Sequence, residues 1–82
     1  MNVAPVYSVN GPTNTVVGEI FGSILPDVAA PTVLGAALCA AAGNPRYSLL
    51  ANPYRGSETA HDQFERGWHR AYEHAQTKAV LA

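Results

Sequence analysis

Apolar side chains recur with a helical period in three segments of the chain. In residues 15–25 they fall three and four positions apart, which is the spacing of one helical face. The members of this face are Val16, Val17, Ile20, Phe21, Ile24 and Leu25. Either Thr13 or Asn14 can cap the segment, and Pro26 is expected to stop it. We therefore predict a first helix over residues 15–25.

Two glycines, Gly18 and Gly22, lie four positions apart in this first helix. Each lowers the stability of an isolated helix by about 1 kcal/mol relative to alanine. Their spacing leaves a strip without side chains, so we expect another helix to approach closely there.

A second helix is predicted over the alanine-rich segment that follows. Pro31 suits its first turn because proline lacks an amide hydrogen where none is needed, and Gly43 suits its C-terminal cap. The expected apolar face comprises Val33, Leu34, Ala37, Leu38 and Ala41. Cys39 lies just off that face and is expected to be a small packing residue. Residues 28–45 are uncharged but interrupted by proline and glycine, which indicates a buried helix rather than a membrane span.

The last helix is predicted to begin at Ser57 or Thr59 and to run to about Lys78. Thr59 and Asp62 approximate a capping box. One stripe of this helix is apolar and is expected to cover the second helix. The stripe comprises Phe64, Trp68, Ala71, Tyr72, Ala75 and Ala79. Gly67 weakens the helix, so we expect a close backbone contact beside Trp68.

The remaining residues form an arm and one long connection. Residues 1–14 contain two prolines and a glycine and are expected to be an extended arm, with a short strand at residues 6–9. The connection is residues 44–56, and its apolar side chains are expected to fold back onto the core. They are Tyr47, Leu49, Leu50 and Tyr54. The fold class predicted is all-α, a single domain over residues 1–82 with three helices and an extended N-terminal arm.

Composition narrows the classes of function. Hydrophobic residues make up 48% of the 82 positions and charged residues 13%, so the chain can build a core. Its net charge is −1 with five Lys and Arg residues, which argues against a protein that mainly coats nucleic acid. The single cysteine, Cys39, cannot form an intramolecular disulfide. The first ten residues contain no Lys or Arg, so we expect no secretory signal and a cytoplasmic location.

Two rows of polar residues follow the last helix at intervals of four positions. The first row is His61, Glu65, His69 and Glu73, and a solvated face is favoured over a metal site because a helical pair needs a further ligand from elsewhere. The second row is Arg66, Arg70, His74 and Lys78, a positive edge that Arg46 and Arg55 can enlarge. A solvent face is favoured over a phosphate-binding site here too, because acidic residues lie close by.

No segment predicts catalysis or a bound cofactor. The glycines are not accompanied by the lysine of a phosphate-binding loop. Ser57 and His61 lie one helical turn apart, but helix capping explains that pair better than nucleophilic chemistry. We therefore expect no enzyme activity, no catalytic residue, no cofactor and no metal.

One stretch points beyond a generic small domain. A turn over residues 52–54 is followed by a polar spacer and then by a helix with a fixed aromatic and glycine pattern. The residues that carry it are Asn52, Pro53, Tyr54, Phe64, Gly67, Trp68 and Ala71. This stretch resembles the C-terminal half of ribosome modulation factor and its small relatives, the Rmf/CrpP-like proteins. The resemblance covers about residues 32–79, is strong over residues 52–75, and implies that residues 32–79 form a helical hairpin.

The resemblance implies a non-enzymatic binding module that docks on a host nucleoprotein assembly such as the ribosome. The residues expected to contact RNA or the partner are Arg55, Arg66, Arg70, Lys78 and Tyr54. Ribosome modulation factor is basic, and the net charge of −1 is a departure from it. The alternative hypothesis is a phage-borne protein inhibitor of a host machine or defence complex, of the anti-CRISPR type. It would bind a protein, or a second copy of itself, through residues 1–25 without contacting nucleic acid.

Overall fold

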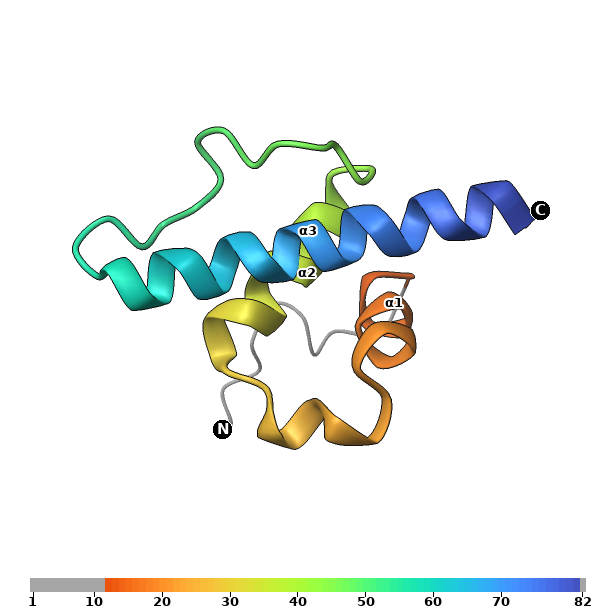
Figure 1. Cartoon of the computed structure of the whole chain (residues 1–82), viewed down its shortest axis with the longest axis horizontal. Coiled ribbons are helices and arrows are strands. Elements are labelled where there is room, and N and C mark those ends of the chain that lie inside the picture. The colour runs from red at the N-terminus through yellow and green to blue at the C-terminus, as the bar shows by residue number, and fades with distance from the viewer. Residues whose placement is uncertain (1–11, 82) are drawn as a thin grey trace.

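Helices make up most of the structure. The computed structural model describes residues 12–81, which form α1 (Pro12–Phe21), the 3₁₀ helix η2 (Gly22–Asp27), α2 (Ala30–Ala41) and α3 (Glu58–Leu81). α3 is the longest element, α2 crosses it, and α1 lies beside its C-terminal half (Figure 1). No strand occurs in residues 12–81, so the all-α, three-helix prediction is confirmed for them. The expected arm and its strand at residues 6–9 lie outside the described residues, except that residues 12–14 belong to α1.

The hydrophobic core lies where the three α-helices meet. α1 contributes Val17 and Phe21, and α2 and α3 contribute the rest. The remaining core members are Val33, Ala36, Ala37, Cys39, Phe64, Trp68 and Ala71. The aromatic stripe of the last helix therefore covers the alanine-rich helix as predicted, although its last member, Ala79, is exposed.

Two glycines allow α2 and α3 to pack at backbone distance. A Cβ atom at Gly67 would overlap the carbonyl oxygen of Thr32, and one at Gly35 would overlap that of Phe64. Each glycine thus faces the backbone of the other helix, which is the close contact predicted for Gly67. This close packing explains why α3 contains Gly67, although an internal glycine lowers the stability of a helix.

The buried face of α2 is rotated about the helix axis relative to the face that the sequence predicts. Cys39 is predicted just off the apolar face, yet its side chain is fully buried, whereas Ala41 is exposed. The reason is that α2 packs on α3 through its smallest residues, so that Leu34 and Leu38 are only partly buried. Burial raises the pKa of the Cys39 thiol from 9.0 to about 11, which fits a packing role and not a nucleophile.

Helix ends follow the predicted signals at α2 and α3 but not at α1. α2 ends in a Schellman motif, in which Gly43 has φ 88° and the Asn44 amide donates to the Cys39 carbonyl at 2.8 Å. At the start of α3 the Ser57 hydroxyl accepts from the Ala60 amide at 3.2 Å. The capping box expected from Thr59 does not form, because α3 begins at Glu58 and Thr59 lies inside its first turn.

The first helix is shorter at its C-terminal end than predicted. α1 ends at Phe21, because Gly22 adopts a left-handed φ of 56° that an α-helix does not contain. The chain then continues as η2, and Pro26 lies inside that element rather than stopping α1. The close helix approach expected at Gly18 and Gly22 is also wrong, since no described atom outside their local chain would lie within 4 Å of a Cβ at either position.

Residues 42–57 form the long connection, which arches over one side of α3 (Figure 1). The prediction that its apolar residues fold back onto the core holds only for Tyr54, which is partly buried against that core. The same prediction is wrong for Tyr47, Leu49 and Leu50, which are 67%, 84% and 86% exposed. As for membranes, none of the helices found in residues 12–81 has both the length and the apolar character that a span requires.

Candidate functional site

The connection between α2 and α3 is fixed to α3 at two places. The first is Pro45, whose carbonyl oxygen accepts a hydrogen bond of 2.8 Å from the Trp68 indole nitrogen. The Cys39 thiol also points at this oxygen, with a sulfur to oxygen distance of 3.6 Å. The tryptophan of the sequence motif therefore has a defined structural task, which is to hold the start of the connection against α3.

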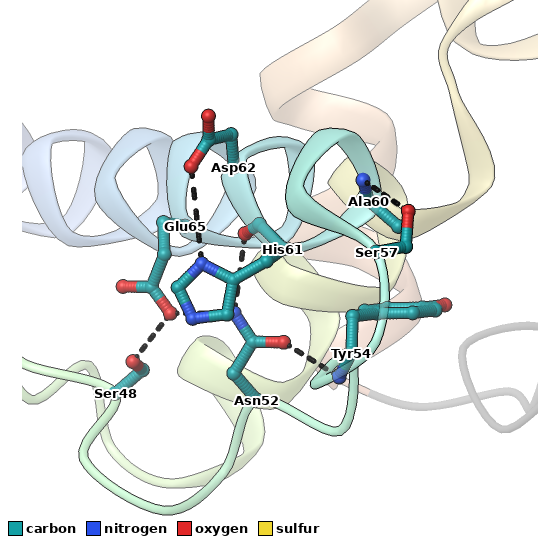
Figure 2. Close-up of polar contacts among 8 residues, drawn as sticks. All are labelled: Ser48, Asn52, Tyr54, Ser57, Ala60, His61, Asp62 and Glu65. Atoms are coloured by element: carbon teal, nitrogen blue, oxygen red, sulfur yellow. Dashed lines mark hydrogen bonds and ion pairs between the residues drawn. The ribbon is translucent and has the colours of Figure 1, made fainter.

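The second attachment is a polar network around Asn52 (Figure 2). The Asn52 amide nitrogen donates to the Glu65 carboxylate at 2.8 Å and to the His61 carbonyl at 3.1 Å. The Ser48 hydroxyl donates to the same Glu65 oxygen at 2.7 Å. Asn52 is 7% exposed and is the buried polar residue of the described core. Glu65, which the sequence places in a row of metal-ligand candidates, is thus the anchor of the loop.

The rest of the turn motif is also structural. The Asn52 side-chain oxygen accepts from the Tyr54 backbone amide at 3.0 Å, which closes an Asx turn across Pro53. The Tyr54 ring then packs against Phe64 with ring centroids 6.1 Å apart. Tyr54 is a sequence candidate for partner contact, and the structure places it half-buried against the core. Fold stability therefore accounts for the turn motif without any ligand.

Between the two attachments the connection presents an exposed apolar surface, which we call the loop patch: Tyr47, Leu49 and Leu50. These side chains lie on both sides of Ser48, whose hydroxyl is held by Glu65. A turn over residues 48–51 is closed by a bond of 2.9 Å from the Ala51 amide to the Ser48 carbonyl. Leu49 has φ 50° in this turn, a left-handed conformation that a leucine rarely adopts. The loop patch is therefore held in place and strained, and it is not a solvated linker.

Most of the predicted positive edge faces α1. Glu19 of α1 contacts His74 at 2.9 Å and accepts a hydrogen bond from Lys78 at 3.2 Å. The bond to His74, followed by that to Lys78, lowers the pKa of the Glu19 carboxyl from its ordinary value of 4.5. These contacts tie α1 to α3, so His74 and Lys78 already have an acidic partner within the chain.

The arginines of the edge differ from one another. Arg70 donates to the Ile20 carbonyl at 3.3 Å, and its guanidinium lies 5.5 Å from the centre of the Phe21 ring. Arg66 and Arg55 are exposed and make no side-chain hydrogen bond or ion pair with any described residue. Of the four cations proposed to contact phosphate, two are thus engaged by α1 and two are available to a partner.

The row of histidines and glutamates does not converge. His69 pairs with Glu73 at 3.1 Å and His61 approaches Asp62 at 3.8 Å, all on the exposed face of α3. Within residues 12–81 no three histidine, cysteine or acidic side chains are grouped closely enough to hold a metal ion. The expectation of a solvated face holds for His61, His69 and Glu73 but is wrong for Glu65, which is half-buried and bonded by Ser48 and Asn52.

A second surface feature lies between η2 and α3, and we call it the η2–α3 groove. It has a volume of about 640 Å³. Phe21, Ile24 and Val28 form its apolar wall, and α3 forms its charged wall. The lining side chains of α3 are Glu65, Arg66, His69 and Arg70. Sequence reasoning missed this groove, although Ile24 and Arg66 each belong to the pattern of their own helix.

The loop patch and the η2–α3 groove are therefore the two candidate binding surfaces. Comparison with known proteins does not indicate a further one. No protein-family model, curated protein or solved structure matches the chain.

Proposed function

We propose that this chain is a small non-enzymatic binding module that docks on a larger host assembly through the loop patch. The observation that carries the proposal is the exposure of Leu49 and Leu50, 84% and 86%, in a loop fixed on both sides by Trp68 and by Asn52. A fixed loop has little conformational entropy left to lose on binding. The free energy gained from the apolar contact therefore contributes to affinity instead of being offset by ordering of the loop.

The chemistry of the loop patch suits a protein surface. Burying one leucine side chain stabilises a complex by about 1.5–3 kcal/mol, and tyrosine is enriched among the residues that dominate interfaces. Arg46 lies with its guanidinium 5.5 Å from the centre of the Tyr47 ring, so a cation borders the patch. An apolar centre with a polar border is the usual arrangement of a docking site.

The ribosome is the assembly that the resemblance to ribosome modulation factor suggests. Within this proposal the chain is cytoplasmic and meets the ribosome mainly through protein, since Arg70 donates to the Ile20 carbonyl and Lys78 donates to Glu19. A second candidate is direct contact with ribosomal RNA. It is favoured by Arg55 and Arg66, which are exposed and have no partner within residues 12–81.

The experiment is cosedimentation of the tagged chain with purified ribosomes and recovery from lysate with and without nuclease. We expect the double substitution Leu49→Ser and Leu50→Ser to abolish recovery of the partner. The matched control is Val80→Ser, which removes an equally exposed apolar side chain, 84%, from the end of α3. Wild-type affinity of the double variant would refute the proposal.

The same experiment separates the kinds of partner. Loss of recovery by Arg55→Gln and Arg66→Gln, together with sensitivity to nuclease, would move the contact to RNA. A nuclease-resistant protein partner other than the ribosome, lost on Leu49→Ser and Leu50→Ser, would support the inhibitor hypothesis instead. In that case deletion of residues 1–12 tests whether the apolar N-terminal segment takes part.

A further inference from the structure

The η2–α3 groove and the loop patch are separate surfaces. In the view of Figure 1 η2 lies below α3, whereas the connection that carries the loop patch arches above it. The groove at about 640 Å³ falls within the range of roughly 300–1,000 Å³ that is typical of ligand sites. A second contact is therefore available beside the first, and Glu65 connects the two, because it lines the groove and also holds Ser48 and Asn52 of the loop.

One wall of the groove is apolar, and Ile24 is its most exposed side chain. Ile24 is 54% exposed, and Val28 is partly buried beside it. Phe21 continues this wall towards the core, where it is 6% exposed. Three large apolar side chains along one wall suit the apolar face of a peptide segment and not a fully polar ligand.

The opposite wall carries a net positive charge. Arg66 and Arg70 lie one helical turn apart on α3, so their guanidinium groups belong to the same face. Arg70 is oriented by the Ile20 carbonyl and the Phe21 ring, and Arg66 has no partner within the described residues. The one acidic residue in the lining, Glu65, is already bonded by Ser48 and Asn52 of the loop.

We propose that the η2–α3 groove binds an acidic amphipathic peptide segment of a partner protein. Apolar side chains of that segment pack on Ile24 and Val28. Its carboxylates form charge-assisted hydrogen bonds with Arg66 and with those guanidinium donors of Arg70 that do not bond to the Ile20 carbonyl. The occupant is assigned by charge complementarity, since the groove joins an apolar wall to two guanidinium groups. This inference goes beyond the docking function proposed above and does not depend on it.

The test uses the full chain and a fluorescein-labelled helical peptide with leucines on one face and glutamates along its border. We expect saturable binding by fluorescence anisotropy, weakening with salt, and NMR amide shifts at Ile24, Val28 and Arg66. Arg66→Gln should lower the affinity about tenfold, since charged pairs across an interface contribute at that scale. Ile24→Ser should lower it by a similar factor.

Matched controls separate the groove from general charge effects. Arg55→Gln also removes the positive charge of an exposed arginine, but Arg55 does not line the groove. This variant should leave the peptide affinity unchanged. A peptide in which lysine replaces each glutamate should not bind. Equal losses from Arg55→Gln and Arg66→Gln, equal binding of the lysine peptide, or no saturable binding of the acidic peptide would each overturn the proposal.

The loop-patch variant distinguishes the two proposals. Leu49→Ser with Leu50→Ser should leave peptide affinity unchanged, because neither residue lines the groove. If that variant loses the peptide while Arg66→Gln keeps it, the peptide binds the loop patch and the groove proposal fails. If both variants bind the peptide like the wild type, the groove proposal fails, and the docking function is then judged by ribosome cosedimentation alone.

Discussion

The amide nitrogen of Asn52 donates a 2.8 Å hydrogen bond to the Glu65 carboxylate, and this contact joins the connection to the N-terminal half of α3. The same carboxylate oxygen accepts from Ser48, so one acidic side chain positions two segments of the loop. The Asn52 side chain also satisfies the His61 carbonyl and the Tyr54 amide. Removing it would take one hydrogen-bond partner each from the Glu65 carboxylate, the His61 carbonyl and the Tyr54 amide, although Ser48 would still donate to Glu65.

Asn52→Ala is therefore expected to lower the free energy of unfolding by about 1–3 kcal/mol, the cost of leaving buried polar groups unsatisfied. Urea unfolding followed by fluorescence of Trp68, the single tryptophan, measures this change. Gln76→Ala is the control, because it removes an exposed amide from α3. Equal stability of the two variants would show that the network contributes nothing to the fold.

Gly67→Ala should destabilise the chain by about 1–3 kcal/mol or prevent folding, as overpacking does. The added methyl group would overlap the Thr32 carbonyl oxygen, which belongs to the backbone of α2 and cannot move independently. Thermal unfolding by circular dichroism measures the loss.

Gly18→Ala is the matched control for that substitution. Gly18 also lies inside a helix, yet no described atom outside its local chain would lie within 4 Å of a Cβ there. Alanine should stabilise α1 at this position by about 0.5–1 kcal/mol. A similar loss at both positions would contradict the close approach of α2 and α3.

Leu49→Asn is expected to separate stability from binding. Leu49 has φ 50°, a left-handed conformation that costs a leucine about 1–2 kcal/mol and asparagine less. The substitution should raise the free energy of unfolding by up to about 1 kcal/mol while it weakens partner recovery. Leu50→Asn should weaken recovery without the gain in stability, since Leu50 is not among the residues with positive φ. Equal stabilities of the two variants would indicate that Leu49 carries no strain.

Local signals are sufficient to predict α2, both of its ends and the start of α3, whereas α3 runs on to Leu81, beyond the predicted end at about Lys78. Pro31 and Gly43 mark α2, and Ser57 caps α3, because each acts on the backbone within one turn of its own position. The close contact at Gly67 is also predicted correctly. A glycine inside a long helix lowers its stability, so its presence indicates that a second backbone lies where a side chain would be. The capping signals do not depend on which element lies opposite, but the glycine argument does, and it is wrong at Gly18 and Gly22, where no second backbone approaches.

The rest of the site depends on contacts that distant segments make. The row of cations on α3 predicts which side chains share a face, but not that Glu19 lies opposite it, 55 residues from His74 and 59 from Lys78. The exposure of Leu49 likewise follows from the anchoring of the loop by Glu65 and Trp68, which hydropathy does not reveal. Similarly, the end of α1 is set by the φ of Gly22, whereas the sequence offers Pro26 as the stronger stop signal.

Glu19 gives the chain a predictable response to acid. Its pKa is lowered from 4.5 by the bond to His74 and then by Lys78, so the folded state favours the ionised carboxylate more than the unfolded state does. Such a group contributes stability at pH values above its unfolded pKa and loses that contribution as the pH falls through the lower folded value. Glu19→Gln should thus be less stable than the wild type at neutral pH, and the difference should shrink as the pH falls below 4.5.

Urea midpoints measured between about pH 6 and pH 3 check this expectation. The effect should be small, because the carboxylate is exposed to solvent and its ion pairs are screened. Lys78→Gln should have little further effect once Glu19→Gln is present, since the two substitutions remove the same contact. If the stability difference instead stays constant as the pH falls, the loss comes from α1 itself, and Glu19 does not fasten that helix to α3.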